Sequence, residues 1–371
     1  MNILYYFYEL NTPMYRWQYL HFIDELKRAG HVVRCFNPLD YCSIDEANEK
    51  VIEIAKSVKS WDLFITCDEQ SIIYRDTVVE ISKLGIPTCL ICWDNLELPY
   101  KQKKIAPIFD LVWITSVETK YLFEKWGCKK ILFLPYAANP YTFTPSWGKA
   151  INAVGFIGSP YGSRVNKLNV LLQAGIQCDV YSDALFQKGY NNSLGSIQHY
   201  KIKDTSIKAF RYLHFPIGRK VLLSTILNKF YSQHSLLADS QFFMAHKSVP
   251  IQEMNNLYSN FSISLNITEL RDTYILRHPV HKLHLRTFEI PMSGGLQIAS
   301  RTTELSSYFE EDKEIVMYGS REEMISKAKF YLDSSNENTV LSMKKAARTR
   351  CEHEHTWMHR FNIVFNELGL N

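Results

Sequence analysis

The chain lacks any apolar run of about 20 residues, the length that a helix needs to cross a lipid bilayer. Its first eight residues also lack the basic start, the long apolar segment and the cleavage site of a secretory signal, and they predict a first β-strand instead. These absences favour a cytoplasmic protein, with at most a peripheral contact to the inner face of the membrane.

Disulfide frameworks and strong charge bias are missing as well. Eight cysteines are scattered over 371 residues, which is typical of reduced core thiols. The net charge of +4 is mild and spread along the chain, so we expect no nucleic-acid partner. A hydrophobic fraction of 46% predicts substantial cores, and the length predicts two domains.

Short apolar runs alternate with amphipathic helical patterns over the first 135 residues. The runs lack period-2 alternation, which indicates strands that are covered on both faces. We therefore predict an α/β domain with a doubly wound parallel sheet. The expected strands are residues 2–7, 31–36, 62–66, 88–93, 111–115 and 130–133, and the expected helices are residues 15–29, 46–58, 70–84 and 116–126.

A stretch rich in Pro, Asn and Gly, residues 135–152, predicts a linker to a second series of the same kind. We expect domains at residues 1–145 and 146–355, with an irregular aromatic insertion at about 183–247 and a final segment at 356–371. Two such domains would face a central cleft at the carboxyl ends of their strands, where ligands bind. The expected strands are residues 153–158, 178–181, 261–265 and 296–299, and the expected helices are residues 164–174, 217–231, 250–258, 286–292, 302–309, 320–333 and 338–369.

The turn after the first strand of this second series could hold an anion. Backbone N–H groups at Gly158 and Ser159, together with the N-terminus of the next helix, are suited to a phosphate. Arg164 and Lys167 lie in the first helical turn, where a cation opposes the helix dipole but suits a bound phosphate. The alternative is an ordinary exposed arginine. The Gly-Lys-Ser or Gly-Lys-Thr ending of a Walker loop is absent, which argues against phosphoryl transfer from ATP.

Residues 286–295, with the sequence Arg-Thr-Phe-Glu-Ile-Pro-Met-Ser-Gly-Gly, combine a cation, a carboxylate and two glycines. Arg286 and Glu289 are three residues apart, so they share a helix face and could direct a guanidinium to phosphate and a carboxylate to ribose. Gly294 and Gly295 would end the helix and begin the next strand. The alternative is an amphipathic core helix with an ordinary glycine stop.

The basic loop before this helix carries His278, His281 and His284 at intervals of three. Pro279 would interrupt a helix that aligned the three imidazoles, and no carboxylate lies among them. An anion-facing loop therefore fits better than a metal site, with His281 and His284 as weaker candidates for positive groups.

In the first half, Asp94 follows a predicted central strand and is a candidate general base or acceptor-binding group. The alternative is that Asp94 caps the turn beside Asn95. Asp68 and Glu69 follow another strand and occupy an equivalent place. The loop at residues 11–13 is a further candidate for acceptor contacts.

Five segments of the second half carry a family resemblance. They are residues 154–159 with Arg164, 254–259 leading into 264–267, 286–295, 304–309 and 314–318. In this order and spacing they resemble the CgeB-like branch of the group 1 glycosyltransferases. The match over residues 1–150 is only architectural. The resemblance implies the GT-B fold, in which two Rossmann-like domains face a cleft and the last helix crosses back to the first domain.

The resemblance also implies a function. A nucleotide-sugar donor would bind to the second domain, and a glycan, lipid-linked or other hydroxyl acceptor would bind to the first, during synthesis of a surface or secreted polysaccharide. Glu289 matches the ribose-binding glutamate, and Ser293, Gly294 and Gly295 would lie near the donor. One departure is His281, which stands where many members have a second glutamate eight positions earlier, so either stereochemical outcome is open.

The resemblance predicts no cofactor other than the donor itself, since GT-B enzymes do not usually use a bound metal and a D-x-D motif is absent. Arg164, Lys167 and Arg286 would then offset the charge of the leaving diphosphate. Two alternatives are a nucleotide-sugar epimerase, which would need no acceptor, and a non-catalytic glycan-binding scaffold, which would bind nucleotide weakly or not at all.

Overall fold

The structure is a computed structural model that describes residues 1–10, 16–57, 60–148, 150–186, 202–231, 236 and 238–370. The loop at residues 11–13, a candidate for acceptor contacts, lies outside these residues. The chain divides into two compact units. Unit 1 comprises Met1–Asn139 and Thr356–Asn371, and unit 2 comprises Pro140–His355.

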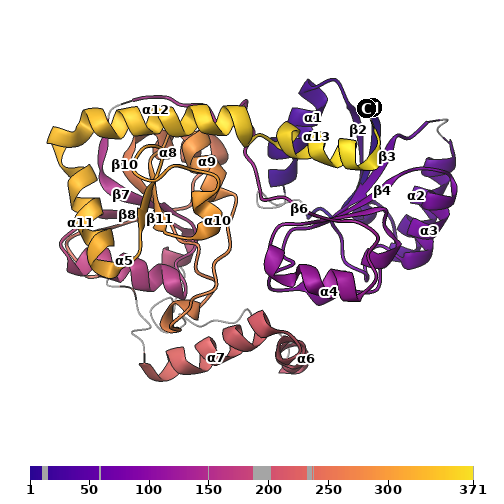
Figure 1. Ribbon diagram of the computed structural model, residues 1–371, viewed down its shortest axis with the longest axis horizontal. Helices are drawn as coiled ribbons and strands as arrows, with labels where there is room; N and C mark the ends of the chain where they lie inside the picture. The colour runs from indigo at the N-terminus through magenta and orange to yellow at the C-terminus, as the bar shows by residue number, and fades with distance from the viewer. Residues whose placement is uncertain are drawn as a thin grey trace. The chain divides into compact units, whose positions relative to one another are not determined.

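Unit 1 is built on one parallel sheet with the strand order β2-β1-β3-β4-β5-β6. Helices cover it on both faces (Figure 1). The inner strands β1, β3, β4 and β5 are almost wholly buried, in agreement with apolar runs that lack alternation. The strands are β1 (Asn2–Tyr6), β2 (Val32–Phe36), β3 (Leu63–Thr66), β4 (Thr88–Cys92), β5 (Leu111–Ile114) and β6 (Ile131–Phe133), and the helices are α1 (Asp24–Arg28), α2 (Ile44–Ser57), α3 (Arg75–Lys83) and α4 (Lys120–Lys125).

The last helix of the chain, α13 (Trp357–Leu368), belongs to unit 1. Its first backbone N–H groups, at Trp357 and Met358, donate to the Glu25 carboxylate of α1 at 3.2 and 2.8 Å. The Trp357 indole donates to His21 Nδ1 at 2.9 Å. Burial raises the pKa of Glu25 to about 7, although these N–H groups lower it. A carboxylate at the helix N-terminus thus ties the end of the chain to α1.

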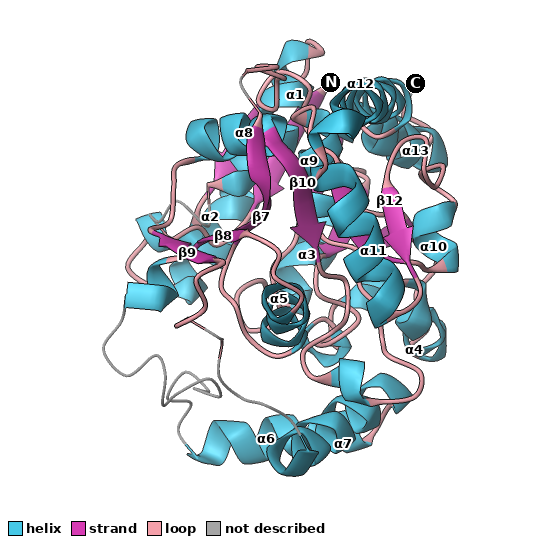
Figure 2. Cartoon of the chain, turned by 90° about the vertical axis from the view of Figure 1, so that its left-hand side faces the viewer, coloured by secondary structure: helices cyan, strands magenta, loops and turns pink. Residues whose placement is uncertain are grey.

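Unit 2 has a second parallel sheet, with the order β12-β11-β10-β7-β8-β9 (Figure 2). The two central strands, β7 and β10, are neighbours although more than 100 residues separate them in sequence. The strands are β7 (Ile151–Ile157), β8 (Cys178–Tyr181), β9 (Phe243–His246), β10 (Phe261–Asn266), β11 (Gln297–Ser300) and β12 (Val316–Tyr318). The helices are α5 (Ser163–Gln173), α6 (Ile202–Leu213), α7 (Pro216–Tyr231), α8 (Ile251–Asn260), α9 (Arg286–Met292), α10 (Thr303–Ser306), α11 (Arg321–Leu332) and α12 (Glu337–Glu354).

The predicted doubly wound α/β class is confirmed in both units, and most expected strands agree with the observed ones to within two residues. One predicted helix was wrong, and three elements were missed: β9, β12 and α6. The helix expected over residues 338–369 is two helices, because the chain bends at His355 and Thr356 begins a new capping box with His359. Strands β9 and β12 were not predicted; β9 is partly exposed and β12 has only three residues. No helix among the described residues is both long and apolar enough to span a membrane.

Arg348 of α12 holds three segments of unit 2 together. Its guanidinium is buried and donates to the backbone carbonyls of Phe143 and Met292, and it also reaches Pro140 O at 3.3 Å and Glu352 Oε1 at 2.6 Å. The start of unit 2 is thereby fastened to the end of α9. This contact places α9 relative to the rest of the sheet.

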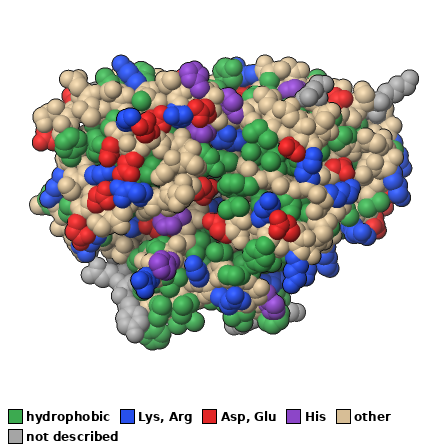
Figure 3. Space-filling view, in the orientation of Figure 1, with side chains coloured by type: hydrophobic (Ala, Val, Ile, Leu, Met, Phe, Trp, Pro, Cys, Tyr) green, Lys and Arg blue, Asp and Glu red, His purple; other side chains and the backbone are tan. Residues whose placement is uncertain are grey.

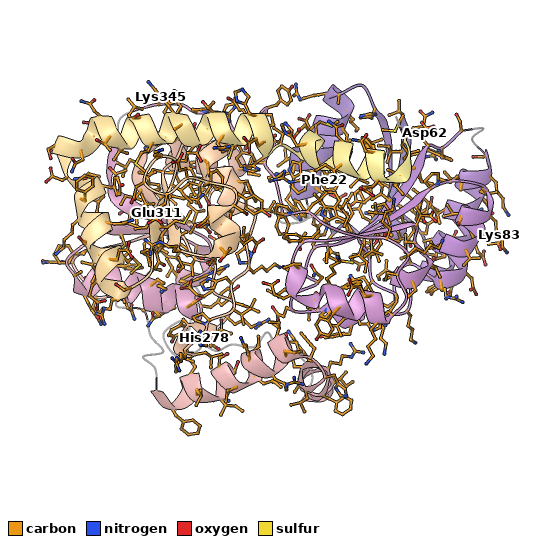
Figure 4. The ribbon with its side chains drawn as sticks, in the orientation of Figure 1. Phe22, Asp62, Lys83, His278, Glu311 and Lys345 are labelled. Carbon is orange, nitrogen blue, oxygen red and sulfur yellow. The ribbon has the colours of Figure 1, made fainter. Side chains whose placement is uncertain are left out.

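We expect Arg348→Met to lower the free energy of unfolding by about 3 kcal/mol, since each buried carbonyl left without a donor costs roughly 1–3 kcal/mol. Chemical denaturation measures the loss. Lys345→Met is the matched control, because Lys345 lies on the exposed face of the same helix (Figure 4). Equal stabilities of the two variants would contradict the role given to Arg348.

Candidate functional site

The strand order of unit 2 reverses between β7 and β10. Chain connections run outward from this point in both directions, so the loops after these two strands separate at the carboxyl edge of the sheet. The loop after β7 is residues 158–162, and the loop after β10 is residues 267–285. Both segments that sequence patterns associate with a phosphate therefore lie at the place where doubly wound sheets bind ligands.

Gly158 and Arg286 lie in close contact at this edge. Gly158 has φ of 140°, a conformation that favours glycine, and a Cβ atom there would overlap a guanidinium nitrogen of Arg286. The Arg286 guanidinium also lies 5.6 Å from the centroid of the Phe156 ring. The missing side chain of Gly158 thus gives the Arg286 guanidinium its position.

Arg164 brings a second guanidinium to the same place. It is half-buried, donates to Ser159 O at 2.9 Å and lies 4.4 Å from the centroid of the Tyr161 ring. Burial, and next the positive charge of Arg286, lower the pKa of Arg164 to about 10. Among the described residues, the contacts that hold these guanidiniums are with two rings and a carbonyl rather than with carboxylates.

Tyr258, on α8, has a buried hydroxyl whose pKa both guanidiniums affect. Burial raises the pKa of Tyr258; Arg286 and Arg164 act to lower it, and Glu289 acts to raise it. All three charged groups must therefore lie close to the hydroxyl. Arg286 and Glu289 come from one face of α9, as their spacing in the sequence predicted.

Two of the three histidines in the loop after β10, His281 and His284, have lowered pKa values. His281 Nδ1 is 2.9 Å from the Thr268 hydroxyl, and burial lowers the pKa of His281. Burial, and next the charges of Lys282, Arg164 and Arg286, lower the pKa of His284 well below its usual range. A lowered pKa disfavours the cationic form, so positive charge from these two imidazoles stays a prediction that their surroundings do not favour.

The N-terminus of α5 is less open to an anion than its sequence suggests. The Ser163 N–H donates to Arg271 O at 2.9 Å, and the Arg164 N–H donates to Tyr161 O at 3.1 Å. The Gly158 N–H likewise donates to Tyr181 O at 3.0 Å. Because these backbone donors already have acceptors, recognition of an anion at this edge would depend on the guanidiniums.

Lys167 forms an internal ion pair that the sequence patterns did not indicate. Its ammonium lies 2.9 Å from Glu269 Oε1, which also accepts from the Ser300 hydroxyl at 2.8 Å. Burial would raise the pKa of Glu269, but Lys167 and Ser300 outweigh it and hold that pKa below the ordinary value. Lys167 as a ligand of the donor stays a prediction, although a carboxylate already balances its charge.

The end of α9 is determined by packing. Gly294 has φ of 74°, and a Cβ atom there would lie 2.8 Å from Pro145 and 2.9 Å from Trp147. A Cβ atom at Gly295 would lie 2.6 Å from the Tyr258 carbonyl. Ser293 is fully buried at the C-cap. The predicted closeness of these three residues to the donor stays a prediction, and packing is a sufficient reason for the glycines.

Unit 1 carries the two carboxylates that are candidates for the general base. Asp94 is exposed in a turn after β4, and its carbonyl accepts from Leu98 N at 2.8 Å. Asp68 follows β3, beside the reversal of strand order between β1 and β3, and accepts from Tyr8 N at 2.8 Å. Burial raises the pKa of Asp68 to about 7, and Glu69 adds to this. Asp94 as the base stays a prediction, and Asp68 has the more strongly perturbed environment.

Sequence reasoning gave no role to Tyr258, Glu269 or Lys282. Glu269 comes three residues after β10, and Lys282 is buried among the cations around His284. The signal for Glu269 was available, since a carboxylate directly after a central strand lies at the ligand-binding edge of a parallel sheet. No such signal exists for Tyr258, whose place depends on how α8 packs against α9.

Comparison with known proteins finds a family match over 138 of the 371 residues. Residues 229–366 match the model of a family described as glycosyl transferase-like. A comparison with curated protein sequences finds no match. The family match confirms the predicted resemblance to group 1 glycosyltransferases, and with it the prediction that the chain is a glycosyltransferase.

Solved structures confirm the GT-B fold. HepE of Anabaena, in complex with UDP and glucose, is 12% identical with a TM-score of 0.57, covering 100% of this chain and 99% of its own. An alpha-glucosyltransferase in complex with UDP-glucose and DNA is 11% identical with a TM-score of 0.64 and the same coverage. A glycosyltransferase from Rickettsia africae is 13% identical with a TM-score of 0.62, again with 100% and 99% coverage.

The Lys167–Glu269 pair predicts an asymmetric response to mutation. We expect Lys167→Met to cost about 3 kcal/mol of the free energy of unfolding, because it leaves a buried carboxylate without its cation. Glu269→Gln should cost less, since Lys167 is partly exposed and can reach water. The double variant should lose less than the sum of the two, which a denaturation cycle measures.

The Lys167–Glu269 pair also predicts how the free energy of unfolding depends on pH. Because the pKa of Glu269 is depressed, its contribution to stability is present above pH about 4.3 and is lost as the pH falls through the folded value. The stability difference between wild type and Glu269→Gln should therefore shrink on acidification. The ion pair would be contradicted if the effects of the two single variants on the free energy of unfolding were strictly additive and did not change with pH.

Proposed function

We propose that this glycosyltransferase takes its sugar from a nucleotide-sugar donor held at the carboxyl edge of the unit 2 sheet. The sugar would pass to a hydroxyl of a glycan or lipid-linked acceptor in the synthesis of a surface or secreted polysaccharide. One observation carries the donor assignment: the guanidiniums of Arg164 and Arg286 are held together beside Gly158 with their contacts directed to rings and a carbonyl.

The chemistry of the donor explains this arrangement. Two like charges in a half-buried place repel each other, and a diphosphate offers oxygens that both guanidiniums can bind. Glu289, on the next turn of α9, would accept hydroxyl protons from the ribose. Two of the structural relatives are complexes, one with UDP and glucose and the other with UDP-glucose, and they support a donor of this class.

The reaction breaks the bond between the anomeric carbon and the diphosphate oxygen and forms a bond to the acceptor oxygen. Negative charge grows on the departing diphosphate, and donors that already point to this place stabilise the transition state. We propose that Arg164 and Arg286 perform this role without a bound metal. Activity in the presence of a chelator is the corresponding test.

A base must accept the acceptor proton if the reaction inverts the anomeric centre. Of the two carboxylates in unit 1, we favour Asp68 over Asp94, because a base works best when its pKa lies near the working pH. Asp68 also lies beside the reversal of strand order in its own sheet, whereas Asp94 lies one strand further out.

The proposed donor site predicts that removing Arg286 weakens the binding of phosphate groups but not of the nucleoside. We expect Arg286→Met to weaken nucleoside diphosphate binding at least tenfold while a nucleoside binds equally weakly to both proteins, and to lower turnover by about 10²-fold. Titration calorimetry against a panel of nucleoside diphosphates measures the first effect. Arg321→Met, an exposed arginine at the start of α11, is the matched control. Unchanged diphosphate affinity in Arg286→Met would remove this residue from the site.

The base predicts a pH profile. Because Asp68 must be ionised to accept a proton, kcat/KM should rise with pH through about 7 in the wild type. Asp68→Asn should abolish this rising limb and lower kcat by about 10²-fold or more. Asp94→Asn is the control and should retain both the limb and most of the activity. Conversion of the nucleotide-sugar to another nucleotide-sugar without acceptor would instead favour an epimerase.

A further inference from the structure

The helical hairpin of α6 and α7 exposes an unusual amount of apolar surface. Six of its large apolar side chains are between 42 and 76% exposed. The most exposed are Phe230 at 76% and Phe210 at 64%, and the others are Ile207, Leu213, Leu223 and Ile226. Exposed apolar side chains in this number are unusual in a folded protein, and where they adjoin they mark a binding face.

The exposed residues of α7 form one stripe. Leu223, Ile226 and Phe230 follow each other at intervals of three and four, which places them on one side of a helix. The opposite side, with Val221 and Ser224, is buried. Asn228 completes this inner side, since it donates to Asp272 Oδ1 at 3.1 Å and accepts from the Tyr274 hydroxyl at 2.7 Å. The helix is thus fixed to unit 2 by one face and presents the other outward.

Positive charge borders the stripe. At 3.6 residues per turn, Lys220 and Lys229 lie about 90° to either side of it, and Arg219 lies at its beginning. Residues 202–231, the two helices with their connection, contain six Lys and Arg and one acidic residue, Asp204. Figure 3 shows basic and hydrophobic side chains together at the lower edge of the molecule, where Figure 1 places α7. The hairpin is therefore a cationic patch within a chain of mild net charge.

We propose that this outward face of α6 and α7 binds the surface of a lipid bilayer that contains anionic lipids. Apolar side chains flanked by lysines are the pattern of a helix that lies in the interface, where the apolar stripe enters the acyl boundary and the long lysine stems reach up to the headgroups. The cations add attraction to anionic headgroups, each by about fivefold in affinity. A protein partner would be expected to meet a face with mixed charges, whereas the sequence of the hairpin holds one acidic residue, Asp204, near the start of α6.

The position of the α6–α7 hairpin in unit 2 links membrane binding to the proposed donor site. The segment that contains α6 and α7 follows β8 and begins at the carboxyl edge of the unit 2 sheet. The Gly158 turn, which follows β7, lies at the same edge. Asp272, which binds Asn228, is next to Arg271, whose carbonyl accepts from Ser163 N. His278, in the same loop, lies beside α7 (Figure 4). A bilayer bound at α7 would therefore lie near the donor edge and would favour an acceptor anchored in lipid.

Vesicle sedimentation with the full chain tests the proposal. We expect the protein to sediment with vesicles of phosphatidylcholine mixed with phosphatidylglycerol, and to do so much less with phosphatidylcholine alone or at high salt. The triple variant Leu223→Ser, Ile226→Ser and Phe230→Ser should lose at least tenfold in vesicle affinity. Phe330→Ser is its control, because Phe330 is 50% exposed on α11, outside the hairpin.

A second pair of variants tests the charges without removing apolar groups. Lys220→Glu with Lys229→Glu should abolish the preference for anionic vesicles, whereas Lys329→Glu with Lys345→Glu, on exposed positions of α11 and α12, should retain it. Nucleoside diphosphate affinity should stay unchanged in all four proteins, which separates this proposal from the donor site. Absence of vesicle binding by the wild type, or equal binding by the hairpin variants, would overturn the proposal. A dimer in solution that the triple variant dissociates would also overturn it.

Discussion

The proximity of two guanidiniums in a half-buried place is the constraint on which the site of unit 2 depends. Burial and mutual repulsion both disfavour the arrangement, as the lowered pKa of Arg164 shows. The fold nevertheless fixes it, because Gly158 leaves room for Arg286 and the Tyr161 ring supports Arg164. Glu289 nearby can balance at most one of the two positive charges, and an anion with several oxygens relieves the repulsion that remains.

The topology of the sheet supplies this proximity. Arg164 and Arg286 are far apart in sequence and meet because the strands that precede them, β7 and β10, are neighbours at the reversal of strand order. Two contacts at the end of α9 then fix its position. Arg348 donates to the carbonyl of Met292, and Gly295 packs against the carbonyl of Tyr258. Residues that never touch a ligand thus determine where the charges lie.

The sequence predicted the parts of this site that depend on local patterns. The bounds of α9 agreed with the expectation, because Arg286 begins an amphipathic turn and Gly294 adopts the left-handed conformation that ends it. The pairing of Lys167 with Glu269 could not be foreseen, because the two residues lie on separate elements and meet only through packing. The lowered pKa values of His281 and His284 have the same origin, since burial and neighbouring cations cause them. The break between α12 and α13 was missed because helix-forming residues continue through it, and only the cap at Thr356 marks the new start.

The central claim is that Arg164 and Arg286 bind the diphosphate of a nucleotide-sugar at the carboxyl edge of unit 2. The most direct measurement is a crystal structure of the full chain with a nucleoside diphosphate that calorimetry shows to bind. The account predicts phosphate oxygens within hydrogen-bond distance of both guanidiniums and ribose hydroxyls on the Glu289 carboxylate. A nucleotide bound elsewhere, with both guanidiniums left without phosphate contacts, would contradict it.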